Sequence, residues 1–157
     1  MKKLFIAAFM FVSTFATNTL ADGHAIKMGI ILGFTGPIES LTPAMAGSAE
    51  LAFKEASDSG SLLGGKVIKP LRADSTCVDS AAATAAAEDL IAQGVVAIMG
   101  ADCSGVTGAV ASNVAVPKGV VMISPSATSP GLTDLDDKGF FFRTAPSDAR
   151  GGQILAD

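Results

Sequence analysis

The chain has 157 residues, of which 49% are hydrophobic and 17% are charged, and its formal net charge is -4. These values fit one packed globular domain and exclude an intrinsically disordered segment. The acidic balance also argues against a nucleic-acid partner, because binding to phosphate backbones depends on an excess of lysine and arginine.

The first 21 residues have the parts of a secretory signal peptide. Lys2 and Lys3 precede the apolar run 4–12, and small residues lead to Ala21. The apolar run is shorter than the ~20 residues of a membrane span, so cleavage near Ala21 is expected rather than an uncleaved anchor. We therefore expect residues 22–157 to fold outside the cytoplasm, in a bacterial periplasm or the equivalent compartment of another exporting organism.

The chain has two cysteines, Cys77 and Cys103. In an oxidising compartment one disulfide is favoured, with two buried free thiols as the alternative. Closing this loop would stabilise the fold by about 3 kcal/mol in the chain-entropy model. No metal site is expected, because the one histidine, His24, lies beside the expected cleavage point and zinc takes three or four ligands.

Strands and helices are predicted to alternate along the mature chain. Residues 26–32 form an almost unbroken apolar run before a Gly/Pro turn, which is typical of a central strand buried on both faces. Thr42 is expected to cap a helix that has Pro43 in its first turn. Apolar residues then recur at helical spacing up to Gly60.

A second unit follows the Gly-Gly turn at residues 64–65. The strand predicted over 66–73 contains Pro70, which cannot donate a ladder hydrogen bond and so indicates an edge strand. An alanine-rich helix capped by Asp79 or Ser80 comes next, and a buried strand is predicted over 95–99.

The same scheme continues to the end of the sequence. A helix is predicted over 106–116, strands over 120–123 and 140–144, and a further helix from Ser147. Alternating strands and helices predict an α/β fold with a doubly wound parallel sheet. Pro70 favours the strand order 2-1-3-4-5, in which the second strand lies at an edge.

Ligands of such sheets bind at the carboxyl ends of the strands, where the loops 33–41, 100–105 and 124–131 are expected. Ser104 feeds one loop into a helix, whose N-terminal N–H groups suit an anion such as a carboxylate. The loop 124–131 adds hydroxyl donors stiffened by two prolines. The alternative is a solvated turn whose hydroxyls serve its own backbone.

No catalytic residues are identified, so neither enzyme activity nor a cofactor is expected. Residues 60–67 approach a phosphate loop, but Val67 replaces the required hydroxyl and the segment leads from a helix into a strand. Asp74 and Asp79 flank Cys77, where they are better explained as helix-capping, solvated carboxylates than as an acid–base pair.

Several short motifs occur in an order that resembles the N-terminal part of leucine/isoleucine/valine-type periplasmic binding proteins. They are residues 26–32 followed by Gly36-Pro37, Gly64-Gly65-Lys66, Cys77, Asp102-Cys103-Ser104, residues 123–130 and Phe142-Arg143-Thr144. The resemblance implies a type I periplasmic binding protein, not an enzyme. Such a protein has two α/β lobes joined by hinge strands, and it delivers an amino acid to an ABC importer in the inner membrane.

The resemblance also implies roles for individual residues. Ser104 and Thr128 would donate hydroxyl and backbone hydrogen bonds to the α-carboxylate, and the carbonyl of Ser126 would accept from the α-ammonium. Leu41 stands where well-known members place an aromatic ring, which leaves the side-chain preference open. Ser126 replaces an alanine of related proteins and would add a hydroxyl for a more polar ligand. The family's cysteine pair is bridged.

Such proteins are more than twice as long, so we expect residues 22–157 to be an incomplete N-terminal lobe of a monomeric protein, with the second lobe absent. A branched-chain amino acid is the first expected ligand. The alternatives are an amide, urea or similar small solute, the extracellular domain of a sensor, and an exported hydrolase.

Overall fold

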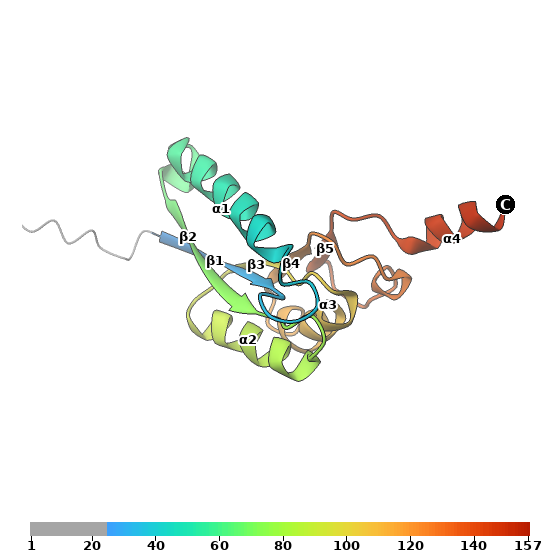
Figure 1. Cartoon of the computed structure of the whole chain (residues 1–157). Helices are drawn as coiled ribbons and strands as arrows, with labels where there is room; N and C mark the ends of the chain where they lie inside the picture. Colours follow the sequence, from blue (N-terminus) through green and yellow to red (C-terminus); the bar gives the residue numbers. More distant parts are fainter. Residues whose placement is uncertain (1–24) are drawn as a thin grey trace, which may run out of the picture.

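The computed structural model describes residues 25–157. The expected signal peptide, its cleavage site and His24 lie outside this range. A parallel sheet forms the centre of the fold (Figure 1), in the order β2-β1-β3-β4-β5. Its strands are β1 (Ala25–Leu32), β2 (Val67–Asp74), β3 (Ala97–Gly100), β4 (Val121–Ser124) and β5 (Phe141–Arg143). The predicted α/β class and strand order are both confirmed.

Helices cover both faces of this sheet (Figure 1). They are α1 (Thr42–Asp58), α2 (Ser80–Ala92), α3 (Ser104–Val110), which continues as the π-helix η3 (Ala111–Ala115), and α4 (Asp148–Ala156), with short 3-10 turns η2 (Leu62–Gly64) and η4 (Pro130–Leu132). One hydrophobic cluster joins α1 to the sheet, and a larger one joins α2 and α3 to its other face. Loops surround the carboxyl ends of the strands.

The edge position of β2 is confirmed. Pro70 pairs in register with Met28 of β1, and no strand lies on the other side of β2 within residues 25–157. A proline is tolerated there because an edge strand leaves every second N–H outside the ladder.

The prediction that Thr42 caps α1 is wrong. Leu41 occupies the cap position, and Thr42 is the first helical residue. Its fully buried hydroxyl donates to the carbonyls of Gly33 (3.1 Å) and Glu39 (3.3 Å). The side chain therefore ties the helix to the preceding loop instead of accepting from the first turn.

Two element boundaries also differ from prediction. Val95 lies in the turn between α2 and β3 rather than in the strand, because its N–H bonds the carbonyl of Leu90 at 3.1 Å and β3 begins at Ala97. Helix α3 begins at Ser104, two residues earlier than expected, with Cys103 as the cap residue. The earlier start places Ser104 in the first turn.

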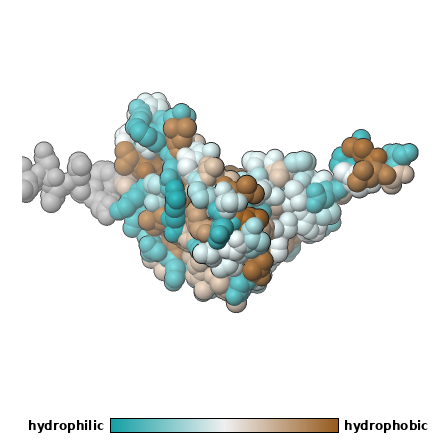
Figure 2. All heavy atoms as spheres, in the orientation of Figure 1, coloured by the Kyte–Doolittle hydropathy of each residue, from teal (hydrophilic) through white to brown (hydrophobic). Residues whose placement is uncertain are grey.

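The last helix, α4, projects away from the sheet (Figure 1), and no residue in it is buried. Apolar atoms, among them those of Ile154 and Leu155, are exposed on it (Figure 2). As predicted, this helix opens at Ser147-Asp148, and the Ser147 hydroxyl caps it by accepting the N–H of Ala149 at 3.3 Å. No helix within residues 25–157 is long and apolar enough to cross a membrane.

Candidate functional site

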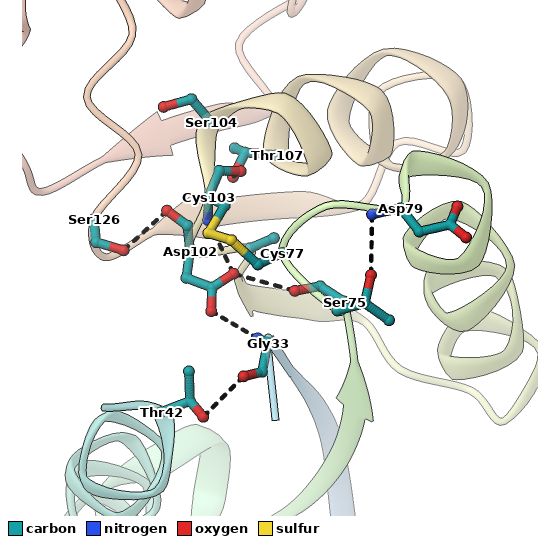
Figure 3. Close-up of a disulfide and its surroundings, with 12 residues drawn as sticks. Gly33, Thr42, Ser75, Cys77, Asp79, Asp102, Cys103, Ser104, Thr107 and Ser126 are labelled. Atoms are coloured by element: carbon teal, nitrogen blue, oxygen red, sulfur yellow. Dashed lines mark hydrogen bonds between the residues drawn. A yellow bond between two sulfur atoms is a disulfide. The ribbon is translucent and has the colours of Figure 1, made fainter. Parts of the chain in front are cut away.

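Loops from β1, β3 and β4 meet at the carboxyl ends of the strands (Figure 3). Hydrogen bonds between residues far apart in the sequence join these loops. The three loops are those predicted from the strand order, and they contain all four predicted ligand-binding residues.

Ser104 and Thr128 are brought together. The Ser104 hydroxyl oxygen accepts the backbone N–H of Thr128 at 3.2 Å and that of Ser129 at 3.1 Å. Ser104, Thr128 and Ser129 are all half-buried. Among residues 25–157 the Ser104 proton has no acceptor, so this hydroxyl remains a donor.

Ser126 lies in the same group through a different contact. Its hydroxyl donates to the carbonyl of Asp102 at 3.0 Å, which joins the β4 loop to the β3 loop (Figure 3). The hydroxyl proton is therefore used inside the protein. The oxygen lone pairs and the backbone carbonyl and N–H of Ser126 have no partner within residues 25–157 and are left to meet a solute.

Leu41 joins these residues only indirectly. It ends the loop after β1, and its side chain is 60% exposed. No hydrogen bond within residues 25–157 links Leu41 to Ser104, Ser126 or Thr128. Its position depends on the loop that carries it.

The loop after β4 is held rigidly by two side chains whose roles the sequence did not reveal. Ser124 is fully buried, donates to the carbonyl of Ala101 and accepts the N–H of Ala127 at 3.1 Å. From β5, Arg143 donates to the carbonyl of Ser129 at 2.7 Å. These contacts fix the backbone around Thr128, so part of the loop's hydroxyl content does serve its own backbone.

Asp102 was not predicted as a site residue, yet it accepts more hydrogen bonds than any of the predicted site residues. One carboxylate oxygen accepts the N–H of Gly33 at 2.6 Å, and the other accepts from the Ser75 hydroxyl at 3.1 Å and the Cys103 N–H at 2.9 Å. The available signal was an aspartate at the end of a buried strand, where a charge needs several donors.

Asp74 is the second carboxylate at this edge, and it accepts from the hydroxyl of Thr35 at 2.6 Å and the N–H of Thr76 at 2.8 Å. Burial raises the pKa of Asp74, but the hydrogen bonds from Thr35 and Thr76 outweigh burial and leave the pKa below its ordinary value. Asp79, one of the two predicted caps of α2, does cap it by accepting from Ala81 and Ala82, whereas Asp74 ends β2 and caps no helix. Asp74 and Asp79 each accept from their own donors, which is not the arrangement of an acid–base pair.

Cys77 and Cys103 are joined in the structure, with Cα atoms 5.2 Å apart (Figure 3). The bond connects the loop after β2 to the cap residue of α3, next to Ser104. No group of three or more His, Cys, Asp or Glu side chains within residues 25–157 is placed to hold a metal ion.

Known proteins are similar to this chain in sequence and in fold. Residues 44–157 match the family model described as "Receptor family ligand binding region". The "Leu/Ile/Val-binding protein homolog 3" of Brucella melitensis is 29% identical over 157 residues, which is 100% of this chain and 41% of that protein. The chain therefore spans about two fifths of this curated relative.

Two solved structures have the same fold. The branched-chain amino acid transporter substrate binding protein LivJ from Streptococcus pneumoniae, in complex with isoleucine, is 33% identical, with a TM-score of 0.69 over 80% of this chain and 35% of that one. A solute binding protein of an ABC transporter from R. palustris, in complex with benzoate, is 26% identical, with a TM-score of 0.69 over 82% and 35%. The two structures match this chain with the same TM-score, and the ligands bound in them, isoleucine and benzoate, both carry a carboxylate.

Proposed function

Because this chain belongs to the receptor family ligand binding region family, as a type I periplasmic binding protein, we propose that it forms the N-terminal lobe of a solute-binding protein. The proposed ligand is an amino acid, with the branched-chain amino acids first. The proposed recipient is an ABC importer permease in the inner membrane. The Leu/Ile/Val-binding relative and the isoleucine-bound structure support this choice.

The observation that carries the proposal is the unused hydroxyl proton of Ser104. The oxygen already accepts two N–H groups, so the proton can only be donated outward. The hydroxyl of Thr128, on the adjoining loop, also has no hydrogen-bond partner within residues 25–157. Two such donors suit the two oxygens of a carboxylate, because hydrogen bonds to an ionised acceptor are short and strong.

The ammonium of the amino acid would be bound separately. The backbone carbonyl of Ser126 accepts no hydrogen bond within residues 25–157, so it is free to accept from an ammonium. A full negative charge would have to come from a facing second lobe. Closure of the two lobes would then bury both charged groups of the ligand with partners.

The proposal includes the protein's location and covalent state. Residues 1–21 would be removed as a signal peptide, and the mature monomer would work in the periplasm. There Cys77 and Cys103 would be oxidised, consistent with their bonding distance in the structure. We propose no catalytic activity for this lobe.

An aromatic carboxylate is the second candidate ligand, favoured by the benzoate-bound neighbour. It would use the same Ser104 and Thr128 donors and would leave the Ser126 carbonyl unpaired. Amides and urea are alternative ligands that the same binding measurements test, and the downstream sequence of the complete reading frame distinguishes a sensor from a transport protein.

The test is ligand binding by the product of the complete reading frame. The mature protein is purified, and thermal shift and calorimetry are recorded with leucine, isoleucine, valine, alanine, benzoate, an amide and urea. We expect the branched-chain amino acids to raise the melting temperature. A response only to benzoate would replace the ligand class, and a response to none of the panel would overturn the proposal.

Thr128→Val is the cleanest variant for the site, because valine keeps the shape and removes a hydroxyl that no protein group uses. We expect a loss of affinity of about tenfold, equal to ~1.4 kcal/mol. The matched control is Thr84→Val, which removes a hydroxyl on α2 that bonds only the carbonyl of Ser80. The control should bind as tightly as the wild type.

A further inference from the structure

Asp102 is a buried carboxylate at the junction of four loops. Asp102 is 3% exposed, and its carboxylate accepts from the loops after β1 and β2 and from the N–H of Cys103. Its own backbone carbonyl accepts from Ser126 in the loop after β4. No lysine, arginine or histidine within residues 25–157 pairs with it, so neutral donors alone balance the charge.

These contacts form a continuous chain between the two parts of the proposed ligand site (Figure 3). Starting from the β4 loop, Ser126 donates to Asp102, the N–H of Gly33 donates to the Asp102 carboxylate, and Thr42 donates to the carbonyl of Gly33. Thr42 directly follows Leu41. The chain thus runs from the loop of Thr128 to the residue beside Leu41.

The approach of the β1 loop to Asp102 is also close. A Cβ atom added to Gly33 would lie 3.3 Å from Asp102 Oδ2 and 3.2 Å from the Cβ of Cys77. A side chain at residue 33 would be crowded against Asp102 and Cys77, so glycine suits this close approach. Because there is so little free space between them, we expect a change at Asp102 to move the β1 loop.

We propose that Asp102 is a positioning residue that sets where Leu41 stands relative to Ser104 and Thr128, and so determines which ligand side chains fit. This inference rests on the proposed function. Asp102 does not touch the ligand in this scheme. It acts through Gly33 and Thr42 on the Leu41 side, while Ser104 and Thr128 are held independently by each other and by Arg143.

Asp102→Asn has the right shape to break one link. Asparagine has one acceptor oxygen, whereas the carboxylate uses both oxygens, for three donors. If the oxygen keeps Ser75 and Cys103, the amide NH2 faces the N–H of Gly33 and repels it. The β1 loop would then move while the carboxylate donors stay in place.

The test compares leucine with alanine, two amino acids with the same charged groups and different side chains, in the complete mature protein. For Asp102→Asn we expect leucine affinity to fall about tenfold and alanine affinity to stay within about twofold of the wild type. The control is Asp79→Asn, the same substitution at the cap of α2, where asparagine caps as well as aspartate. The control should change neither affinity.

Two outcomes would overturn the inference: unchanged leucine affinity in a folded Asp102→Asn protein, or equal losses for both ligands. Should this variant fail to fold, Thr42→Val is the second test, because valine keeps the shape of threonine and removes the hydrogen bond to the Gly33 carbonyl. Thr42→Val must then lower the affinity for leucine relative to that for alanine. Wild-type protein that binds neither amino acid would instead overturn the proposed function. In that event, amide hydrogen exchange still decides the positioning step, because exchange in residues 33–41 must be faster in Asp102→Asn than in Asp79→Asn.

Discussion

Two neighbouring rows of side chains cross the same strands on opposite faces, and their burial differs. The first row consists of Ile98, Met122 and Phe141, which are paired in register across β3, β4 and β5. All three are buried in the cluster formed with α2 and α3. This row is covered from one end to the other.

The second row lies one residue further along each strand and therefore faces the side of α1. It consists of Ile30, Met99, Ile123 and Phe142, again in register. Ile30 is fully buried, Met99 is partly buried, and Ile123 and Phe142 are 41% and 51% exposed. Exposure increases with distance from α1.

The comparison teaches that an apolar residue in a strand does not by itself imply a core residue. Both rows are equally hydrophobic, but only one has helices over its whole length within residues 25–157. The free energy gained by burial therefore differs between adjacent residues of β4. Substitutions in the two rows test this difference directly.

The largest expected effect is for Met122→Ala, measured against Ile123→Ala as the matched residue in the other row. Met122 is fully buried, so its truncation should lower the free energy of unfolding by about 3 kcal/mol. Ile123→Ala should cost less than about 1 kcal/mol. Urea denaturation of both variants gives the comparison. Equal losses would mean that something outside residues 25–157 covers Ile123.

The next effect concerns the covered face of the sheet, where α2 and α3 pack. There the cysteine pair joins the loop before α2 to the start of α3. Replacing Cys77 and Cys103 together by serine should lower stability by about 3 kcal/mol, because the closed loop spans 26 residues. Thermal unfolding of the double variant measures the loss.

The control for the cysteine variant is reduction of the wild-type protein. Dithiothreitol should lower the wild-type melting temperature to that of the double variant and leave the double variant unchanged. Free thiols in the untreated, denatured protein would contradict the oxidised state.

The fold was largely predictable because its signals are local. Apolar runs marked the strands, and Pro70 marked the edge strand because a ring nitrogen cannot donate to a ladder. Side-chain chemistry alone narrowed the cap of α2 to Asp79 or Ser80, and the structure shows Asp79. Thr42 was misread because a threonine before proline can cap a helix or donate elsewhere, and the choice depended on the carbonyl of Gly33, which the fold brings near.

The site was predictable only in part, for the same physical reason. Ser104 and Thr128 were named from hydroxyl content, loop position and the family resemblance, and the structure brings them together. Asp102 and Arg143 act through backbone groups contributed by distant loops. Such partners carry no sequence pattern, so the roles of these two side chains become visible only when the loops are placed.

The smallest effect concerns how α1 is fastened to the sheet on the less covered side. Arg72 of β2 donates from Nε and a terminal nitrogen to the two carboxylate oxygens of Glu50, at 2.7 and 2.8 Å. The hydrogen bond from Arg72 lowers the pKa of Glu50 below its ordinary value of 4.5, against an opposing effect of burial. The pair is exposed, so Glu50→Gln should cost about 0.5 kcal/mol at pH 7.

The pH dependence of this loss follows from the direction of the shift. A carboxylate whose pKa is lower in the folded state stabilises the fold above its unfolded pKa, and that contribution disappears as the pH falls through the folded value. Wild type and Glu50→Gln should therefore differ at pH 7 and converge well below pH 4.5. Glu55→Gln, on the same helix and without an ion pair within residues 25–157, is the control and should show neither effect. A difference that persists at low pH would mean that Glu50 holds α1 by packing rather than by charge.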